Sequence, residues 1–152
     1  MRDTVLLAYA RAGLAGKSPY APGTCGSLLA IALAPFLFMP LPMWGRLLLL
    51  LFVLFTGIRA ASRAEELLGK RDPSEVVIDE VLGQWLTCLP FGVLGFWEYA
   101  AAFALFRLFD IVKPWPVRQL ESLHGGAGIM LDDAAAGLQA MLCLALLRCL
   151  IC

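Results

Sequence analysis

The strongest membrane signal in the sequence, the apolar run of residues 47–58 (LLLLLFVLFTGI), restricts what this chain can fold into. With its flanks it is long enough to cross a bilayer as a helix, at about 1.5 Å of rise per residue. Apolar residues make up 61% of the 152 residues and charged residues 16%, which is far more apolar than a water-soluble domain. We therefore expect a membrane protein that forms one domain, residues 1–152.

Prolines and glycines divide the remaining apolar sequence. Residues 27–44 end in Pro40-Leu41-Pro42, which should turn the chain and pair this segment with residues 47–58 in a helical hairpin. Residues 81–106 are long for one crossing yet short for two, and a proline and two glycines interrupt them. We favour a shallow or re-entrant hairpin that turns at Pro90, Gly92 and Gly95; a single tilted crossing is the alternative.

The last apolar segment, residues 134–152, could be a fourth span or could lie partly in the membrane interface. Strand signals are weak throughout the chain. The sequence therefore predicts an all-α polytopic membrane protein with about four apolar helical segments and at least one broken or re-entrant hairpin.

Charged residues balance, with twelve Lys and Arg against twelve Asp and Glu. The chain has no net positive charge that would attract nucleic acid, so nucleic-acid binding is not expected. Basic residues cluster beside the apolar segments, and the positive-inside rule places these clusters on the cytoplasmic side. They are Arg2, Arg11 and Lys17; Arg59, Arg63, Lys70 and Arg71; and Arg107, Lys113 and Arg118.

A first polar segment, residues 18–27 (SPYAPGTCGS), combines hydroxyl groups with two prolines and two glycines. A helix is expected to begin only at Thr24 or Ser27. Backbone N–H groups at such a helix start, with the hydroxyls of Ser18, Thr24 and Ser27 beside them, suit a phosphate. A plain capping turn would explain the same residues.

Two acidic pairs stand at the edges of apolar helices. Asp79 and Glu80 precede Gly83, and Asp132 and Asp133 follow a glycine-rich loop and precede Gly137. A glycine four residues after an aspartate lies one helical turn above it and leaves room for a metal ion or another backbone. Compensation of the helix dipole is the alternative explanation for each pair.

A third polar segment, residues 107–118 (RLFDIVKPWPVR), places Arg107 and Asp110 on one helix face and ends the helix just beyond Lys113. A structural salt bridge would explain the first two residues. The functional alternative gives Asp110 to a metal ion and Lys113 to a phosphate.

Missing residues exclude several phosphatase chemistries. No Cys-x₅-Arg pattern and no Asp-x-Asp-x-Thr/Val pattern occurs, and His124 is the sole histidine. The remaining candidates are rich in carboxylates, which match a hard cation with oxygen ligands, namely Mg²⁺.

The segments SPYAPGTCGS, VVIDEVLGQW, RLFDIVKPWPVR and GGAGIMLDD occur in this order, and together they resemble the phosphatidylglycerophosphatase A family. The resemblance extends from about residue 13 to residue 139. It implies an all-helical, Mg²⁺-dependent enzyme of the bacterial inner membrane, with several crossings, that acts in phospholipid synthesis. Its substrate would be the phospholipid phosphatidylglycerophosphate, which the enzyme converts to phosphatidylglycerol and phosphate at the cytoplasmic face.

The hypothesis for the site assigns Mg²⁺ to four carboxylates, with Asp79, Asp110 and Asp133 as the catalytic residues. Asp110 would be another ligand or would orient the attacking water. Arg107 and Lys113 would neutralise phosphate charge, and Ser18, Thr24 and Ser27 would hold its oxygens. The metal ligands would be Asp79, Glu80, Asp132 and Asp133.

Two other classes of function remain open. A small cation transporter would also place carboxylates beside broken helices, but its polar residues would line a pore from opposite sides. In a non-enzymatic scaffold the polar segments would only cap helices. The oligomeric state, the number of metal ions and activity on other lipid phosphates, such as phosphatidic acid, also remain open.

Overall fold

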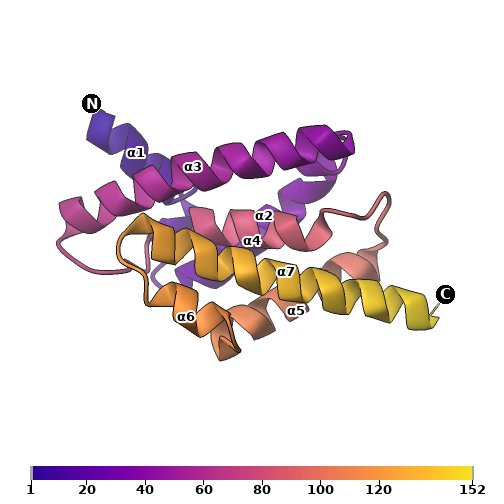
Figure 1. Ribbon diagram of the computed structural model, residues 1–152. Coiled ribbons are helices and arrows are strands. Elements are labelled where there is room, and N and C mark those ends of the chain that lie inside the picture. Colours follow the sequence, from indigo (N-terminus) through magenta and orange to yellow (C-terminus); the bar gives the residue numbers. More distant parts are fainter. Residues whose placement is uncertain (1, 152) are drawn as a thin grey trace.

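The computed structural model describes residues 2–151, and all regular structure within that range is helical (Figure 1). This confirms the expectation of an all-α chain. The elements are α1 (Arg2–Ala10), the 3₁₀ turn η1 (Ala15–Lys17), α2 (Pro22–Leu33), the π-helical stretch η2 (Ala34–Phe38), α3 (Met43–Leu68), α4 (Ile78–Cys88), α5 (Phe96–Val112), α6 (Val117–Glu121) and α7 (Gly126–Ile151).

Helix α4 lies at the centre of the molecule. It packs most extensively against α7 and also against α2, α3 and α5, while α7 packs in addition against α3, α5 and α6. Helix α1 lies along α3 (Figure 1). Helix α4 is shorter than the four helices that surround it and is buried among them, so its polar side chains Glu80, Gln84 and Thr87 are buried as well.

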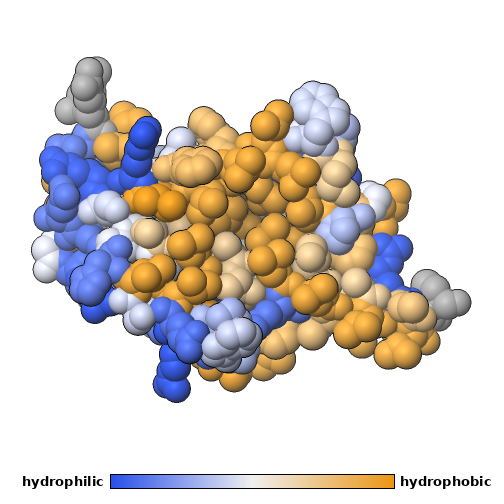
Figure 2. Space-filling view, viewed as in Figure 1, coloured by the Kyte–Doolittle hydropathy of each residue, from blue (hydrophilic) through white to orange (hydrophobic). Residues whose placement is uncertain are grey.

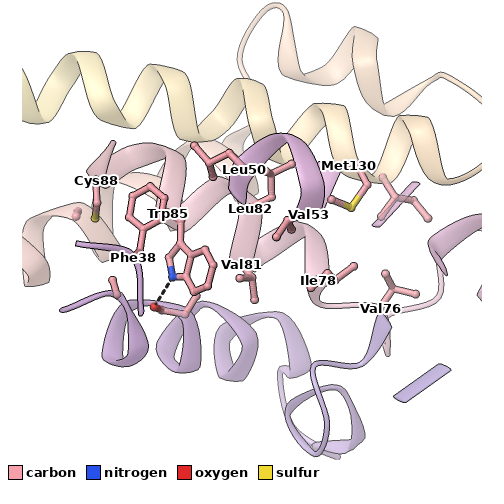
Figure 3. Close-up of a cluster of buried hydrophobic side chains, with 14 of the residues drawn as sticks. Phe38, Leu50, Val53, Val76, Ile78, Val81, Leu82, Trp85, Cys88 and Met130 are labelled. Atoms are coloured by element: carbon pink, nitrogen blue, oxygen red, sulfur yellow. Dashed lines mark hydrogen bonds between the residues drawn. The ribbon is translucent and has the colours of Figure 1, made fainter. Parts of the chain in front are cut away.

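The apolar core fills the space between α2, α3, α4 and α7 (Figure 3). The Phe38 ring stacks on Trp85 with a centroid separation of 5.4 Å. Trp85 also donates a hydrogen bond of 2.9 Å from Nε1 to the carbonyl oxygen of Ala30, so its buried polar atom is satisfied. These contacts fix α2 against the centre of α4.

Both predicted interruptions are present. The chain turns between η2 and α3 at residues 39–42, and it leaves helical structure between α4 and α5 at residues 89–95. Arg46 joins the two turns: its side chain is buried and donates to the carbonyl oxygens of Met39 (2.6 Å), Leu89 (3.0 Å), Leu41 (3.0 Å) and Phe91.

Two predicted helix starts were wrong. Helix α2 begins at Pro22, before Thr24 and Ser27, because proline fits the first helical position, where no N–H partner is needed. Helix α7 begins at Gly126, within the segment expected to be a glycine-rich loop before a helix start at Asp132 and Asp133. Gly126 packs against the carbonyl oxygen of Ile58 so closely that a Cβ would overlap it. Helix packing therefore overrides the low helix propensity of glycine.

Helices α3 and α7 are long and apolar enough to cross a membrane. Only 33% of the most apolar stretch of α3 and 44% of that of α7 is buried, whereas a core helix of a soluble protein would be mostly covered. Figure 2 shows hydrophobic residues over the middle of the molecule and hydrophilic residues at the end where α3 finishes and α7 begins. The number of crossings and the re-entrant position of α4 and α5 stay predictions.

Candidate functional site

Four polar segments, namely residues 18–27, 76–85, 107–118 and 125–133, each contribute residues to a site at the hydrophilic end of the molecule. The N-terminal ends of α2, α4 and α7 and the C-terminal end of α5 surround a cavity of about 250 Å³, which we call the acid cavity. Its wall includes Pro22, Gly23, Asp72, Asp79, Glu80, Asp110, Lys113, Asp132 and Asp133.

Helices α4 and α7 cross at the two glycines that follow the acidic pairs. A Cβ on Gly137 would overlap the carbonyl oxygen of Gly83, and a Cβ on Gly83 would lie 2.7 Å from the carbonyl oxygen of Asp133. The room predicted beside these glycines is therefore filled by the other backbone. Asp79 and Asp133 lie one turn before the crossing on their respective helices, which brings both carboxylates to the acid cavity.

Asp79 and Asp133 each carry a shielded oxygen without a hydrogen-bond partner. Oδ1 of Asp79 and Oδ2 of Asp133 are both inaccessible to solvent, and no described residue donates to either atom. Such atoms are expensive because a buried polar group normally has a partner. Their environment favours a cationic ligand in the cavity.

Glu80 is buried and bound by a cation and a hydroxyl. Arg107 Nη1 lies 2.8 Å from Oε1 and 2.7 Å from Oε2 of Glu80, and 2.7 Å from Oδ2 of Asp110. The hydroxyl of Ser27 also donates to Glu80. A Cβ on Gly23, the second residue of α2, would overlap the carboxylate of Glu80. A side chain at this position would therefore displace the carboxylate.

Lys113 ends α5 and joins two acidic residues. Its Nζ lies 2.8 Å from Oδ2 of Asp132 and 2.8 Å from Oε1 of Glu121. Burial alone would lower the pKa of Lys113, but the hydrogen bonds and charges of these two carboxylates raise it above the ordinary value. The ammonium group is therefore positively charged at neutral pH.

The donor atoms partly fit a hard cation such as Mg²⁺. Carboxylate oxygens are suitable ligands, and Asp79 and Asp133 have oxygens that nothing else in the described chain engages. Glu80 and Asp132 instead take part in ion pairs. Within residues 2–151 no three carboxylates are already gathered closely enough to form a metal cluster.

The predicted hydroxyl ligands are not gathered in one place. Ser18 is only half-buried, does not line the acid cavity, and donates a 2.8 Å bond to the carbonyl oxygen of Tyr20. Thr24 is also half-buried and outside the cavity wall. Ser27 is buried and bonded to Glu80, so it holds a carboxylate in this structure.

Sequence reasoning missed three residues at this end. Asp72 lines the cavity and Glu121 pairs with Lys113, although neither belongs to an apolar helix. Gln84 is fully buried one turn beyond Glu80, and neither of its amide atoms has a partner among the described residues. Only Gln84 has a sequence signal, because it is a lone amide inside an apolar helix.

Several known proteins are similar to this chain. A protein of Bacteroides thetaiotaomicron, provisionally named phosphatidylinositol-3-phosphatase, is 44% identical over 88% of this chain and 87% of its own length. Phosphatidylglycerophosphatase A of Escherichia coli strain K12 is 36% identical, over 80% of this chain and 71% of its own. Phosphatidylglycerophosphatase A of Haemophilus influenzae is also 36% identical, over 80% and 76%.

No solved structure matches the chain. Residues 8–148 match the family described as phosphatidylglycerophosphatase A. That range contains all four polar segments and every residue that we have placed at the acid cavity. The family that the sequence motifs indicate is confirmed: the chain belongs to the phosphatidylglycerophosphatase A family.

Proposed function

We propose that this protein is a lipid phosphatase that hydrolyses the terminal phosphomonoester of phosphatidylglycerophosphate. The products would be phosphatidylglycerol and inorganic phosphate. The observation that carries the proposal is the pair of unpartnered carboxylate oxygens, on Asp79 and Asp133, in a cavity that Lys113 also lines. Membership of a family whose curated relatives are named phosphatidylglycerophosphatase A supports the choice of substrate.

Asp79 and Asp133 are the residues that would hold Mg²⁺, because both line the cavity and each has an oxygen without a partner among the described residues. When bound, the ion would supply charge stabilisation for the phosphoryl group and an activated water. Glu80 and Asp132 would bind the ion only if their ion pairs with Arg107 and Lys113 break. Otherwise these two carboxylates hold Arg107 and Lys113 in position.

The protein's own cations have a separate role. Lys113 lines the cavity, and Arg107 lies directly behind Glu80 and Asp110, so both bring positive charge toward a phosphate. Asp110 lines the same cavity and accepts from Arg107, and its carboxylate would orient the attacking water. The N-terminal turn of α2 contributes backbone at Pro22 and Gly23.

Ion transport accounts less well for the arrangement. A transporter would need polar groups along a path through the molecule, whereas the four polar segments meet at one end. The fully buried ring of Phe106 packs against Gly83 at the glycine crossing.

A second candidate substrate is a phosphatidylinositol phosphate. The relative from Bacteroides thetaiotaomicron carries a name of that kind and is 44% identical. Both lipids present a phosphomonoester on a headgroup that is joined to a diacylglycerol, so the same cavity chemistry would serve either.

The test is phosphate release by the purified protein in detergent. Phosphatidylglycerophosphate, phosphatidylinositol 3-phosphate and phosphatidic acid would be offered separately, with Mg²⁺ or with EDTA. We expect Mg²⁺-dependent release that is fastest with phosphatidylglycerophosphate. Thermal unfolding without substrate gives a second readout, because a bound ion at 100 times its Kd should stabilise the fold by about 2.7 kcal/mol. Folded protein that releases phosphate from none of the lipids would overturn the proposal.

A further inference from the structure

A second cavity lies along α2, beside the acid cavity. It is an open groove of about 690 Å³ lined by apolar side chains and two small polar ones. We call it the α2 groove; its lining residues are Ala12, Leu14, Ala15, Ser18, Cys25, Leu28 and Leu29. None of these residues lines the acid cavity, so the groove is a separate feature.

On α2, the residues that line the α2 groove begin one helical turn after a residue that lines the acid cavity. Cys25, Leu28 and Leu29 follow the spacing i, i+3, i+4 and therefore form one stripe on the helix. Pro22 lies three residues before Cys25 on the same face, and it lines the acid cavity. A ligand with a polar head in the acid cavity could thus extend along this stripe, one helical turn after another.

The outer wall of the groove is formed by an irregular segment with a fixed conformation. Ala12 has φ = 45° and Ala21 has φ = 47°, a left-handed conformation that costs an alanine about 1 kcal/mol or more. Gly16 packs so closely on the carbonyl oxygen of Glu75 that no side chain would fit there. The segment is therefore held beside α2 by packing, and the groove is already formed without a ligand.

We propose that the α2 groove holds the first part of an acyl chain of the lipid whose phosphomonoester enters the acid cavity. The proposal rests on the proposed function, which supplies a substrate with a charged head and apolar tails. Moving a chain from the bilayer into an apolar groove gains little free energy, because lipid tails are as apolar as leucine. The groove would instead orient the lipid and so position its phosphate.

The first experiment compares a diacyl substrate with its headgroup alone. Wild type, Cys25→Trp and Leu28→Trp would be assayed with long-chain phosphatidylglycerophosphate and with its water-soluble deacylated form. Filling the groove should lower the ratio of kcat/KM for the diacyl substrate to that for the deacylated one by about tenfold. Leu48→Trp, on the exposed face of α3, is the matched control and should leave the ratio unchanged.

The second experiment locates the chain directly in the wild-type protein. Phosphatidylglycerophosphate with a diazirine on one acyl chain should label residues 12–29, and phosphatidylcholine with the same chain should label them much less. Equal labelling by the two lipids, or filled variants with the wild-type ratio, would refute the groove proposal while leaving the phosphatase intact. Hydrolysis of neither substrate by wild type would instead refute the proposed function. Labelling by neither lipid, in protein that migrates as a dimer, would assign the groove to a second copy.

Discussion

In each acidic pair, one carboxylate forms an ion pair with a basic side chain and the other does not. Glu80 accepts from Arg107 and Asp132 from Lys113, whereas their neighbours Asp79 and Asp133 retain unpartnered oxygens. Successive residues on a helix point about 100° apart, so the two members of a pair face different surroundings. Two adjacent acidic residues in one helical turn can therefore form a structural ion pair with one carboxylate and leave the other carboxylate available to bind a metal ion.

The first prediction concerns the unpartnered carboxylates. Asp79→Asn or Asp133→Asn should reduce phosphate release by at least about 100-fold, because a proposed ligand of the Mg²⁺ that would stabilise the phosphoryl charge is lost. Neither substitution should lower the unfolding temperature in EDTA, because each replaces a buried carboxyl group that has an oxygen without a partner. Glu66→Gln, which changes an exposed carboxylate on α3, serves as the control for both measurements. Unchanged turnover in the folded variants would favour a scaffold.

The second prediction concerns the pair of Glu80 and Arg107. Arg107→Ala should destabilise the fold by about 3–5 kcal/mol, because Glu80 is left buried without its cation. The double variant Glu80→Gln with Arg107→Met should lose distinctly less than the single one. Chemical unfolding in mixed micelles measures both. Arg63→Ala breaks an exposed pair with Asp3 and should change the stability far less than Arg107→Ala does. A double variant as unstable as Arg107→Ala would contradict this explanation.

At the scale of the elements, the crossing of α4 and α7 determines where the carboxylates lie. Gly83 and Gly137 allow the two backbones to touch one turn from Asp79 and Asp133. The sequence contains this information as two acid-x₃-Gly patterns, but it does not show that each glycine makes room for the other helix. That pairing depends on residues more than fifty positions apart.

The third prediction tests the crossing. Gly83→Ala would place a methyl group 2.7 Å from the carbonyl oxygen of Asp133 and against the Phe106 ring, so α4 and α7 must separate. We expect a loss of about 1–3 kcal/mol in stability and about 100-fold in turnover. Gly92→Ala is the matched control, because nothing lies within 4 Å of the added carbon. Phosphate release and thermal unfolding would be measured for both variants. Equal effects of the two substitutions would argue against the crossing.

Much of the fold could be predicted because the bilayer restricts the choice to helices and because proline and glycine mark the breaks. The turns near Pro40 and Pro90 follow from these rules. Arg46 could not be interpreted in the same way: its sequence context resembles an interfacial cation, but it is buried against four carbonyl oxygens of two turns. The pairing of Lys113 with Glu121 could not be predicted either, because Glu121 belongs to a short helix without apolar periodicity.

At the scale of the whole molecule, the fourth prediction concerns orientation in the membrane. Lys17→Cys and His124→Cys, in a variant without native cysteines, should both react with an impermeant maleimide from the cytoplasmic side only. Val93→Cys, in the turn between α4 and α5, should be unreactive from either side, because the 11 residues of α4 rise only about 16 Å. Whole cells and inverted vesicles provide the two sides. Labelling of Val93→Cys from outside would show that this turn reaches the far interface.

The direct contact between α4 and α7 also bears on how the protein tolerates bilayers of different thickness. Hydrophobic mismatch is accommodated by helix tilt, and α4 and α7 would tilt together because their backbones touch at Gly83 and Gly137. The separation of Asp79 and Asp133 is set by two backbones in contact, and it does not depend on the depth of either helix in the lipid. A change in bilayer thickness that tilts this helix pair would therefore leave Asp79 and Asp133 at the same separation.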